Sequence, residues 1–344
     1  MRKIALPEPG RLVLQNDCQA VEKQLQTVRI DVNACGICGS DLALLRGKRS
    51  LKDERYFGHE FSGTVIDAGE EYNGITAGIR VASELSKTCG KCWNCRNGLS
   101  NYCRSMNDAL LPGGFAEETL VLNTPDYSFL SPIPDTLDDI TATLLEPANC
   151  SYHIATRAQM KPGDTVAVFG LGAIGLIAAR ILRYLGAGRV VGIDRNQTRI
   201  EEVRKTGIVD TVNSGDVDWQ EQIREMCGEC GPDIVVEATG APTVFPDALR
   251  IVRPGGRVVA GSVYSGSIEQ FEPIPIMRKE LTVVGAKGPY PSLKTDGTSV
   301  VVDVVDRLQD DLKKIIKVYE YDEALRAFED AASGAAVKAV IKFK

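Results

Sequence analysis

Four cysteines lie within fifteen residues of the chain, spaced C-x2-C-x2-C-x7-C. Thiolates at such short separations can converge on one tetrahedral zinc ion, with Zn–S bonds of about 2.3 Å, without a large fold to assemble them. The intervening Gly and Asn residues suit tight turns, and Lys and Arg offset the charge of a tetrathiolate. Because four protein ligands leave no open coordination position, the pattern predicts a structural zinc. The predicted ligands are Cys89, Cys92, Cys95 and Cys103.

A second pattern, GLGAIG, places three glycines between an apolar run and a helical pattern. In dinucleotide-binding proteins the first glycine allows a tight turn, the second lets the pyrophosphate approach the backbone, and the third allows close helix–strand packing. The N-terminus of the following helix then faces the phosphates. Asp194 ends the next expected strand, nineteen residues after Gly175. A carboxylate at this position accepts the ribose hydroxyls of NAD and repels the 2′-phosphate of NADP.

The residues after Asp194 leave the choice of dinucleotide open. Arg195 and Arg199 would tolerate a phosphate, although a solvated helix start explains them equally well. We therefore predict NAD in preference to NADP. The predicted cofactor-binding residues are Gly170, Gly172, Ala173, Ile174, Gly175, Asp194, Arg195 and Arg199.

The chain has two histidines, and one of them has candidate metal ligands near it. His59 lies in GHE, and Cys38 lies twenty-one residues earlier in GICGSD. A catalytic zinc keeps three protein ligands and one open position, which Cys, His and a carboxylate can supply. Glu60 and Glu146 are the candidate carboxylates, and spacing does not choose between them. On spacing alone, a buried thiol and a core histidine are the simpler interpretation of Cys38 and His59.

The elements that must position these residues change character along the chain. Up to about residue 150, short β-branched runs bounded by Gly, Asp and Asn predict a β-rich domain. From Asp164, apolar runs alternate with helical patterns, which predicts a doubly wound parallel sheet with TVNSGD as a break between helices. The final AVKAVIKFK is expected to return to the first domain. We therefore expect an α/β protein with one domain at 1–150 and 287–344, which carries the zinc lobe at 89–103, and an inserted nucleotide-binding domain at 151–286.

Composition limits the possible partners. The 344 residues carry a formal net charge of -6, which argues against binding to nucleic acid. No secretory h-region and no bilayer-length apolar stretch are visible, so no membrane partner is expected. Ten cysteines without a secretory signal indicate metal ligands and buried thiols of a reducing compartment. We expect a cytoplasmic protein, and the alternative of two disulfides in the cysteine lobe is disfavoured.

Taken together, the motifs resemble the zinc-containing medium-chain alcohol dehydrogenases, most closely the sorbitol (polyol) and threonine dehydrogenase branch. The resemblance runs in order over nearly the whole chain. It implies a GroES-like β-rich catalytic domain with an inserted Rossmann domain, one catalytic and one structural zinc per chain, NAD, and a homodimer or homotetramer. The segments that carry it are GICGSD, GHEFSG, the four-cysteine lobe, GGFAE, LLEPANC, GLGAIG with Asp194, and the tail EALRAFE…KAVIKF.

The resemblance also implies roles for single residues. Cys38, not Cys35, and His59 would bind the catalytic zinc. The glutamates Glu60 and Glu146 would serve as third ligand, as exchanging ligand, or through a water. The hydroxyl of Ser40 would take the proton from the bound alcohol, and Asp41 would fix the zinc site.

The implied reaction is hydride transfer to NAD from a secondary alcohol of a polyol, sugar or amino-polyol. Amino alcohols such as threonine and butanediol-type diols are the alternative substrates.

Departures from the family pattern concern the proton path and the substrate cleft. Ala43 stands where relatives commonly carry a proton-relay histidine, so the path beyond Ser40 stays open. Leu44 replaces an aromatic residue of the sorbitol dehydrogenases, and GGFAEE places Glu118 beside the expected substrate cleft. A carboxylate there would favour a cationic amino-polyol; a solvent-facing glutamate is the equal alternative.

Two other functions fit parts of the sequence. A zinc-free quinone or enone reductase using NADPH would share the scaffold, but it would not need Cys38, His59 or the cysteine lobe. A zinc-stabilised NADH sensor without catalysis would not need Ser40 or Glu146. Cys227 and Cys230 form C-G-E-C, but a redox or metal role is disfavoured because the pair lies near a helix end. His153 is interpreted as a packed core residue, with a contact to cofactor or substrate as the alternative.

Overall fold

The computed structural model describes residues 1–20, 22, 25–48, 57–106, 113–264, 266–268, 271–291 and 299–344. The chain divides into two compact units. Unit 1 comprises Met1–Asn149 and Pro289–Lys344, and unit 2 comprises Cys150–Gly288. Among the helices of the described ranges, none has the length and apolar character needed to cross a bilayer.

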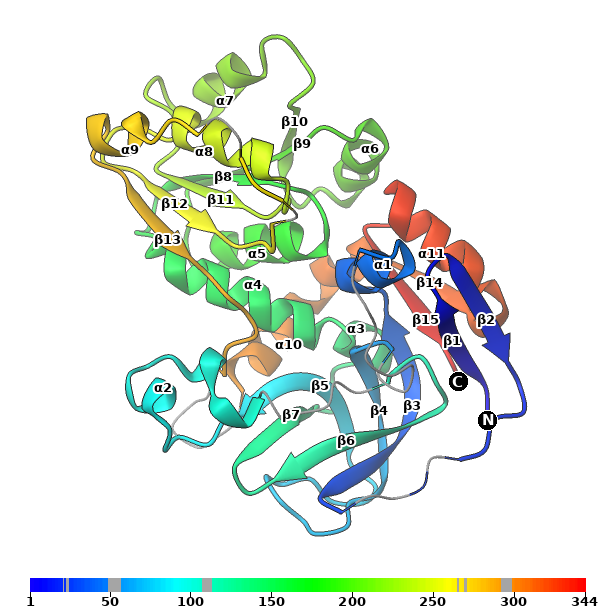
Figure 1. Cartoon of the computed structure of the whole chain (residues 1–344). Helices are drawn as coiled ribbons and strands as arrows, with labels where there is room; N and C mark the ends of the chain where they lie inside the picture. Colours follow the sequence, from blue (N-terminus) through cyan, green and yellow to red (C-terminus); the bar gives the residue numbers. More distant parts are fainter. Residues whose placement is uncertain are drawn as a thin grey trace. The chain divides into compact units, whose positions relative to one another are not determined.

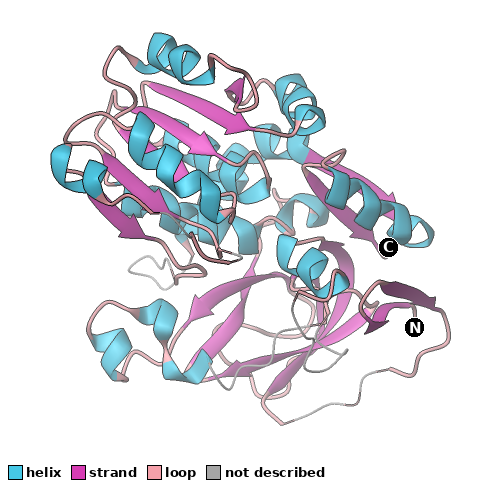
Figure 2. Cartoon of the chain, turned by 45° about the horizontal axis from the view of Figure 1, so that its top comes forward, coloured by secondary structure: helices cyan, strands magenta, loops and turns pink. Residues whose placement is uncertain are grey.

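Unit 1 is built on a seven-stranded sheet in the order β14-β15-β3-β4-β5-β7-β6. A further pairing between β3 and β6 closes five of these strands into a barrel, whose strands curve in Figure 2. A separate antiparallel pair, β1 and β2, precedes it. The strands are β1 (Lys3–Glu8), β2 (Arg11–Gln15), β3 (Thr27–Gly36), β4 (Glu60–Asp67), β5 (Arg80–Lys87), β6 (Glu118–Thr124), β7 (Tyr127–Pro132), β14 (Ile316–Glu320) and β15 (Lys338–Lys342).

The barrel core follows from alternation along β3, where Val28, Ile30 and Val32 are buried and their neighbours are partly exposed. Three phenylalanines, Phe57, Phe115 and Phe328, meet with ring centroids 4.8–5.8 Å apart. Phe328 belongs to α11, which packs on β14 and β15 (Figure 1). The helices of this part of the chain are α1 (Gly39–Leu45), α2 (Trp93–Arg96), α3 (Asp139–Ala142), α4 (Leu145–Ala158, which continues into unit 2), α10 (Val300–Leu312) and α11 (Ala324–Ser333).

A buried carboxylate ties several segments of unit 1 together. Glu84 on β5 is fully buried and accepts hydrogen bonds from Ser131 at 2.6 Å, Asn149 at 2.9 Å and Ser299 at 2.7 Å. Ser299 also caps the N-terminus of α10, and Asn149 accepts a hydrogen bond from the backbone of Tyr290. The last residue before unit 2 and the first residues after it are therefore fixed to the same barrel strand.

Unit 2 contains a six-stranded parallel sheet in the order β10-β9-β8-β11-β12-β13. In Figure 1, α5 covers one face and α7 and α8 cover the other. The strands are β8 (Thr165–Phe169), β9 (Arg189–Asp194), β10 (Asp210–Asn213), β11 (Ile234–Glu237), β12 (Arg257–Ala260) and β13 (Thr282–Gly285). The helices are α5 (Ala173–Tyr184), α6 (Gln197–Thr206), α7 (Trp219–Cys227), α8 (Phe245–Ile251) and α9 (Ile274–Arg278).

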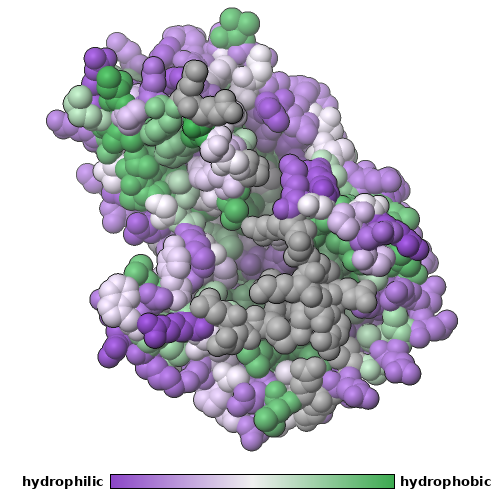
Figure 3. Space-filling model, in the orientation of Figure 1, coloured by the Kyte–Doolittle hydropathy of each residue, from purple (hydrophilic) through white to green (hydrophobic). Residues whose placement is uncertain are grey.

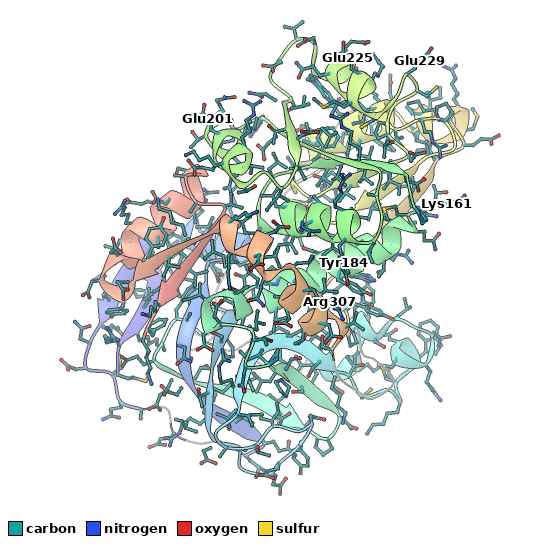
Figure 4. The ribbon with its side chains drawn as sticks, turned by 180° about the vertical axis from the view of Figure 1, so that it is seen from behind. Lys161, Tyr184, Glu201, Glu225, Glu229 and Arg307 are labelled. Carbon is teal, nitrogen blue, oxygen red and sulfur yellow. The ribbon has the colours of Figure 1, made fainter. Side chains whose placement is uncertain are left out.

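The helices of unit 2 keep apolar residues against the sheet and charged residues outside. Ile200 on α6 and Ile223 on α7 are fully buried. Glu201 and Glu225 from the same helices are exposed and lie at the periphery in Figure 4. The sheet is thus covered on both faces, as a doubly wound sheet requires.

The expected GroES-like barrel and Rossmann sheet are confirmed, and β15 pairs with β3 as the sequence predicted for the C-terminal tail. One expectation was wrong: TVNSGD is not a plain break, because Asp210–Asn213 forms strand β10. Only Val212 of this short edge strand is fully buried, so it lacks the apolar run of its neighbours. Helix α10 was also missed, since its VVVDVV start has the composition of a strand.

Candidate metal centres and dinucleotide site

The four-cysteine lobe follows β5 and is organised by short helical turns. Cys92 is the N-cap of α2, and Cys103 ends the next turn, at Ser100–Tyr102. The Sγ–Sγ distances are 3.9 Å for Cys89–Cys95, 3.5 Å for Cys92–Cys95 and 3.4 Å for Cys89–Cys103. Tetrahedral coordination with 2.3 Å bonds requires sulfurs about 3.8 Å apart. The donor set therefore fits a four-coordinate structural zinc.

Two of the four cysteines, Cys92 and Cys103, have a lowered pKa, which favours the thiolate form that binds zinc, whereas burial raises the pKa of Cys95 to about 11. Backbone hydrogen bonds from Arg104 and Cys95 lower the pKa of the Cys92 thiol to about 6. The Cys89 amide donates to the Cys103 sulfur at 3.4 Å. Backbone hydrogen bonds therefore favour the thiolate at two of the four candidate ligands.

The second group of ligand-type side chains lies where β3 ends and β4 begins. Antiparallel pairing sets Gly36 opposite Glu60, so Cys38 and His59 leave the two strands side by side. The ligand atoms of Cys38, His59 and Glu60 all lie within 4.8 Å of one another. Within the described residues, this trio and the cysteine lobe are the groups of three or more such side chains that could hold a metal.

Asp41 supports this trio from the first turn of α1. Its carboxylate accepts a hydrogen bond from the Cys38 amide at 2.8 Å and lies 3.7 Å from Nδ1 of His59. Burial raises the pKa of Asp41 to about 6, against the opposing effect of His59. Burial lowers the pKa of His59, but the charges of Cys38 and Asp41 outweigh it and raise that pKa well above its usual value.

A buried lysine that sequence reasoning missed completes this centre. Lys338 on β15 is 2% exposed, forms an ion pair with Glu60 and donates to the carbonyl of Ile37 at 3.1 Å. Burial lowers the pKa of Lys338, but the charges of Glu60 and Cys38 outweigh it and raise that pKa. The sequence feature that could have identified this residue is a lysine inside the apolar run AVKAVIKF.

The two candidate carboxylates differ in placement. Glu60 is within the trio, whereas Glu146, in the first turn of α4, is outside it. Burial raises the pKa of Glu146 to about 7, partly offset by His59. Glu146 is therefore a second carboxylate within electrostatic reach of His59.

The other predicted residues of unit 1 lie in different surroundings. Ser40 is half-buried in the first turn of α1, and its amide lies 3.5 Å from the Cys38 sulfur. Leu44 packs against the barrel core. Glu118 lies on β6 and faces Arg29 of β3, with 3.9 Å between the charged atoms. Glu118 is therefore paired with the guanidinium of Arg29 and is not part of the trio of Cys38, His59 and Glu60.

In unit 2 the glycine turn has the geometry that dinucleotide binding requires. Gly170 has a φ of +92°, and a side chain on Gly175 would come within 1.9 Å of the Gly170 carbonyl. A side chain on Gly172 would meet no atom within 4 Å, so space remains on that side. Ala173 and Ile174 begin α5 directly after the turn. The residues present therefore fit a bound pyrophosphate.

A hollow of about 320 Å³ adjoins this turn, lined by Gly170, Gly172, Asp194, Arg195 and Arg199 among others. The Asp194 carboxylate accepts hydrogen bonds from the backbone amides of Leu171 and Asn196, each at 2.9 Å. It thereby joins the glycine turn to the end of β9. The position suits a carboxylate that binds ribose hydroxyls.

The remaining candidates stay outside both metal centres and the hollow. Cys227 is buried and Cys230 is exposed. Burial raises the pKa of Cys227 to about 11, which disfavours the thiolate. His153 is buried, and burial together with Arg157 and Lys287 lowers its pKa to about 4.

Separate substitutions should remove the two zinc ions one at a time. We expect Cys103→Ser and Cys38→Ser each to retain one zinc per chain by elemental analysis, against two in the unchanged protein. Cys103→Ser should also lower the melting temperature by about 5–10 °C, because its lobe depends on the metal. Cys230→Ser is the matched control and should keep both ions. Loss of both ions from either variant would contradict two independent sites.

Comparison with known proteins identifies the family of the chain. Residues 24–135 match the alcohol dehydrogenase GroES-like domain, and residues 173–301 match the zinc-binding dehydrogenase family. The protein named probable D-xylulose reductase A of Aspergillus clavatus is 31% identical over 91% of this chain and 88% of its own. The sorbitol dehydrogenase of Halalkalibacterium halodurans is 29% identical over 91% of each chain.

Solved structures have the same fold over the whole chain. A Sinorhizobium meliloti 1021 protein, assigned as a zinc-binding dehydrogenase and bound to NADP, has a TM-score of 0.82 at 28% identity, covering 99% of this chain and 98% of its own. The alcohol dehydrogenase TADH of Thermus sp. ATN1 has a TM-score of 0.80 at 26% identity, covering 99% of each. With the family models and the reductase match, these establish that the chain belongs to the zinc-binding medium-chain alcohol dehydrogenases and is a zinc-dependent NAD(P) dehydrogenase of the alcohol and polyol type.

Proposed function

We propose that this enzyme oxidises a secondary alcohol of a polyol to a ketone, with NAD as hydride acceptor, at a zinc held by Cys38, His59 and Glu60. The observation that carries the proposal is the convergence of these three donors within 4.8 Å. Three protein ligands leave one position for the substrate hydroxyl, unlike the closed four-cysteine site. When bound, zinc polarises that oxygen and lowers its pKa, and NAD accepts the hydride.

The surrounding residues orient the donors and receive the proton. The Asp41 carboxylate lies 3.7 Å from Nδ1 of His59. The other ring nitrogen of His59, Nε2, is therefore the one that would bind the metal. Lys338 balances the buried charge of Glu60. Ser40, two residues after Cys38, takes the hydroxyl proton. Glu146 provides a further carboxylate, as an exchanging ligand or through a water.

The substrate proposal is an uncharged polyol. The curated relatives include proteins named for sorbitol, D-xylulose and D-arabinitol. An amino-polyol would need a free anion in the cleft, and the charge of Glu118 is countered by Arg29. This pairing favours the uncharged substrate.

We also propose that the enzyme forms homo-oligomers through the edge of its parallel sheet. Strand β13 ends the sheet order and is largely exposed, including Val283. Helix α9, labelled at the upper left of Figure 1, carries the exposed residues Ile274 and Met277, and the surface at the upper left of Figure 3 is largely hydrophobic. An apolar, unpaired strand edge invites pairing with a second copy.

A substrate screen tests the proposed reaction. The protein with two zincs should reduce NAD with xylitol, sorbitol or arabinitol, and less readily with threonine, butanediol or an amino-hexitol. Cys38→Ser should lower kcat/KM by at least about 100-fold, since the metal site is lost. Glu118→Gln should leave the ratio of plain to aminated substrates unchanged. Activity confined to aminated polyols, or none in the screen, would contradict the proposal.

Asp194→Ser tests the preference for NAD. Removing the carboxylate takes away the acceptor for the ribose hydroxyls and the repulsion of a 2′-phosphate. We expect kcat/KM for NAD to fall and that for NADP to rise, changing their ratio by about tenfold or more. Glu201→Ser on the exposed face of α6 is the control. An unchanged ratio would exclude this role for Asp194.

Val283→Lys tests the oligomer interface. A charge on the exposed edge of β13 should disfavour strand pairing and shift the mass in light scattering towards the monomer. Val217→Lys, at a fully exposed position in the loop before α7, should keep the original mass. An oligomer unaffected by Val283→Lys would place the interface elsewhere.

A further inference from the structure

A second hollow of unit 2, of about 800 Å³, lies at the opposite edge of the parallel sheet from the glycine turn. Arg189, the first residue of β9, lines this hollow, whereas Asp194, the last residue of the same strand, lines the dinucleotide hollow. The length of strand between them is about 16 Å. The two hollows share no lining residue among those described. The second hollow is therefore separate from the dinucleotide site.

Three arginines from different elements line this second hollow, which we call the arginine hollow. Arg183 belongs to the last turn of α5, Arg189 to β9 and Arg204 to the last turn of α6. Asp210, at the start of β10, is the carboxylate among the described lining residues, and it pairs with Arg189 at 2.9 Å. Three arginines and one aspartate leave the described lining with a formal charge of +2.

The hydrogen bonds of the other two arginines leave their charges uncompensated. Arg183 donates to the carbonyls of Ala187 and Gly188, just after α5, where the carbonyl end of a helix attracts cations. Arg204 instead donates through Nε to the hydroxyl of Thr211 on β10, at 2.8 Å. This bond fixes the guanidinium between α6 and β10. Its two terminal nitrogens have no hydrogen-bond partner in the part of the chain that the structure describes.

The rest of the wall includes apolar side chains. Ile208 and Val209 lie between α6 and β10, and Met226 lies in the last turn of α7. All three are half-buried. Guanidinium forks match the oxygens of a phosphate, and an apolar wall suits an uncharged organic group. The volume of the hollow is also within the range of small-molecule sites.

We propose that the arginine hollow binds a phosphate monoester of a small organic molecule. Arg183 and Arg204 hold the phosphate, and its organic part lies against Ile208 and Val209. A phosphate monoester carries close to two negative charges at pH 7, which matches the charge of the lining. Asp210 would repel a phosphate beside Arg189, so the other two arginines are the ones that bind it. This site is additional to the proposed oxidation and does not depend on which alcohol or dinucleotide the enzyme uses.

Calorimetric titration with phenyl phosphate tests the site without measuring turnover. The protein is first saturated with its dinucleotide, so that the glycine turn is occupied. One phenyl phosphate should bind per chain, about tenfold or more tightly than inorganic phosphate, which has no organic part. Arg204→Gln and Arg183→Gln should each weaken this binding about tenfold or more, as for the loss of a charged hydrogen bond. All variants should bind the dinucleotide unchanged.

Arg224→Gln is the matched control, because this arginine lies on α7, pairs with Glu221 and is outside the lining. It should bind phenyl phosphate as the unchanged protein does. Equal weakening by Arg224→Gln would indicate a response to net charge alone and would overturn the site. Absence of saturable binding, equal binding by Arg204→Gln, or no preference over inorganic phosphate would also overturn the proposal, and each would leave the proposed function in place. If Arg183→Gln fails to fold, Arg204→Gln decides.

Discussion

A lysine and a glutamate separated by 278 residues form a buried ion pair beside Cys38. Lys338 and Glu60 come from β15 and β4, on either side of β3, and meet over Gly36. A side chain on Gly36 would come within 2.7 Å of the lysine and 2.9 Å of the glutamate. Removing one partner of such a pair typically costs about 3–5 kcal/mol, because the other charge stays buried. Glu60 therefore has its counter-ion beside Cys38 and His59 because the C-terminal strand returns to the barrel.

The two metal centres reach their geometry by different routes. The cysteine lobe needs only short turns, and its thiols are prepared by neighbouring backbone amides, as at Cys92. The trio needs the β3–β4 pairing, the helix start at Cys38 and the charge of Lys338. A local site of this kind suits a closed structural zinc. A site that keeps a position open depends on rigid elements to hold its ligands apart.

In unit 2 the parallel sheet positions the candidate cofactor-binding residues. Strand order places the glycine turn, Asp194, and the turns after β11 and β12 along one edge. The Asp194 carboxylate accepts a hydrogen bond from Leu171 in the turn itself, so the carboxylate proposed to bind the ribose is tied to the backbone proposed to face the phosphates. Preorganised polar groups of this type lower the entropy cost of binding a flexible dinucleotide.

Sequence alone determined the features whose cause is local. The spacing of the four cysteines, the glycine turn before α5 and the alternation of strands and helices each depend on a few consecutive residues. Tertiary structure decided what depends on distant partners. It placed Glu60 rather than Glu146 with Cys38 and His59, supplied Lys338, and gave Glu118 a counter-ion. It also made a strand of Asp210–Asn213, whose composition is not that of a buried strand. The physical reason is that burial and charge pairing are properties of neighbours in space. A sheet sets those neighbours by register, which no short stretch of sequence encodes.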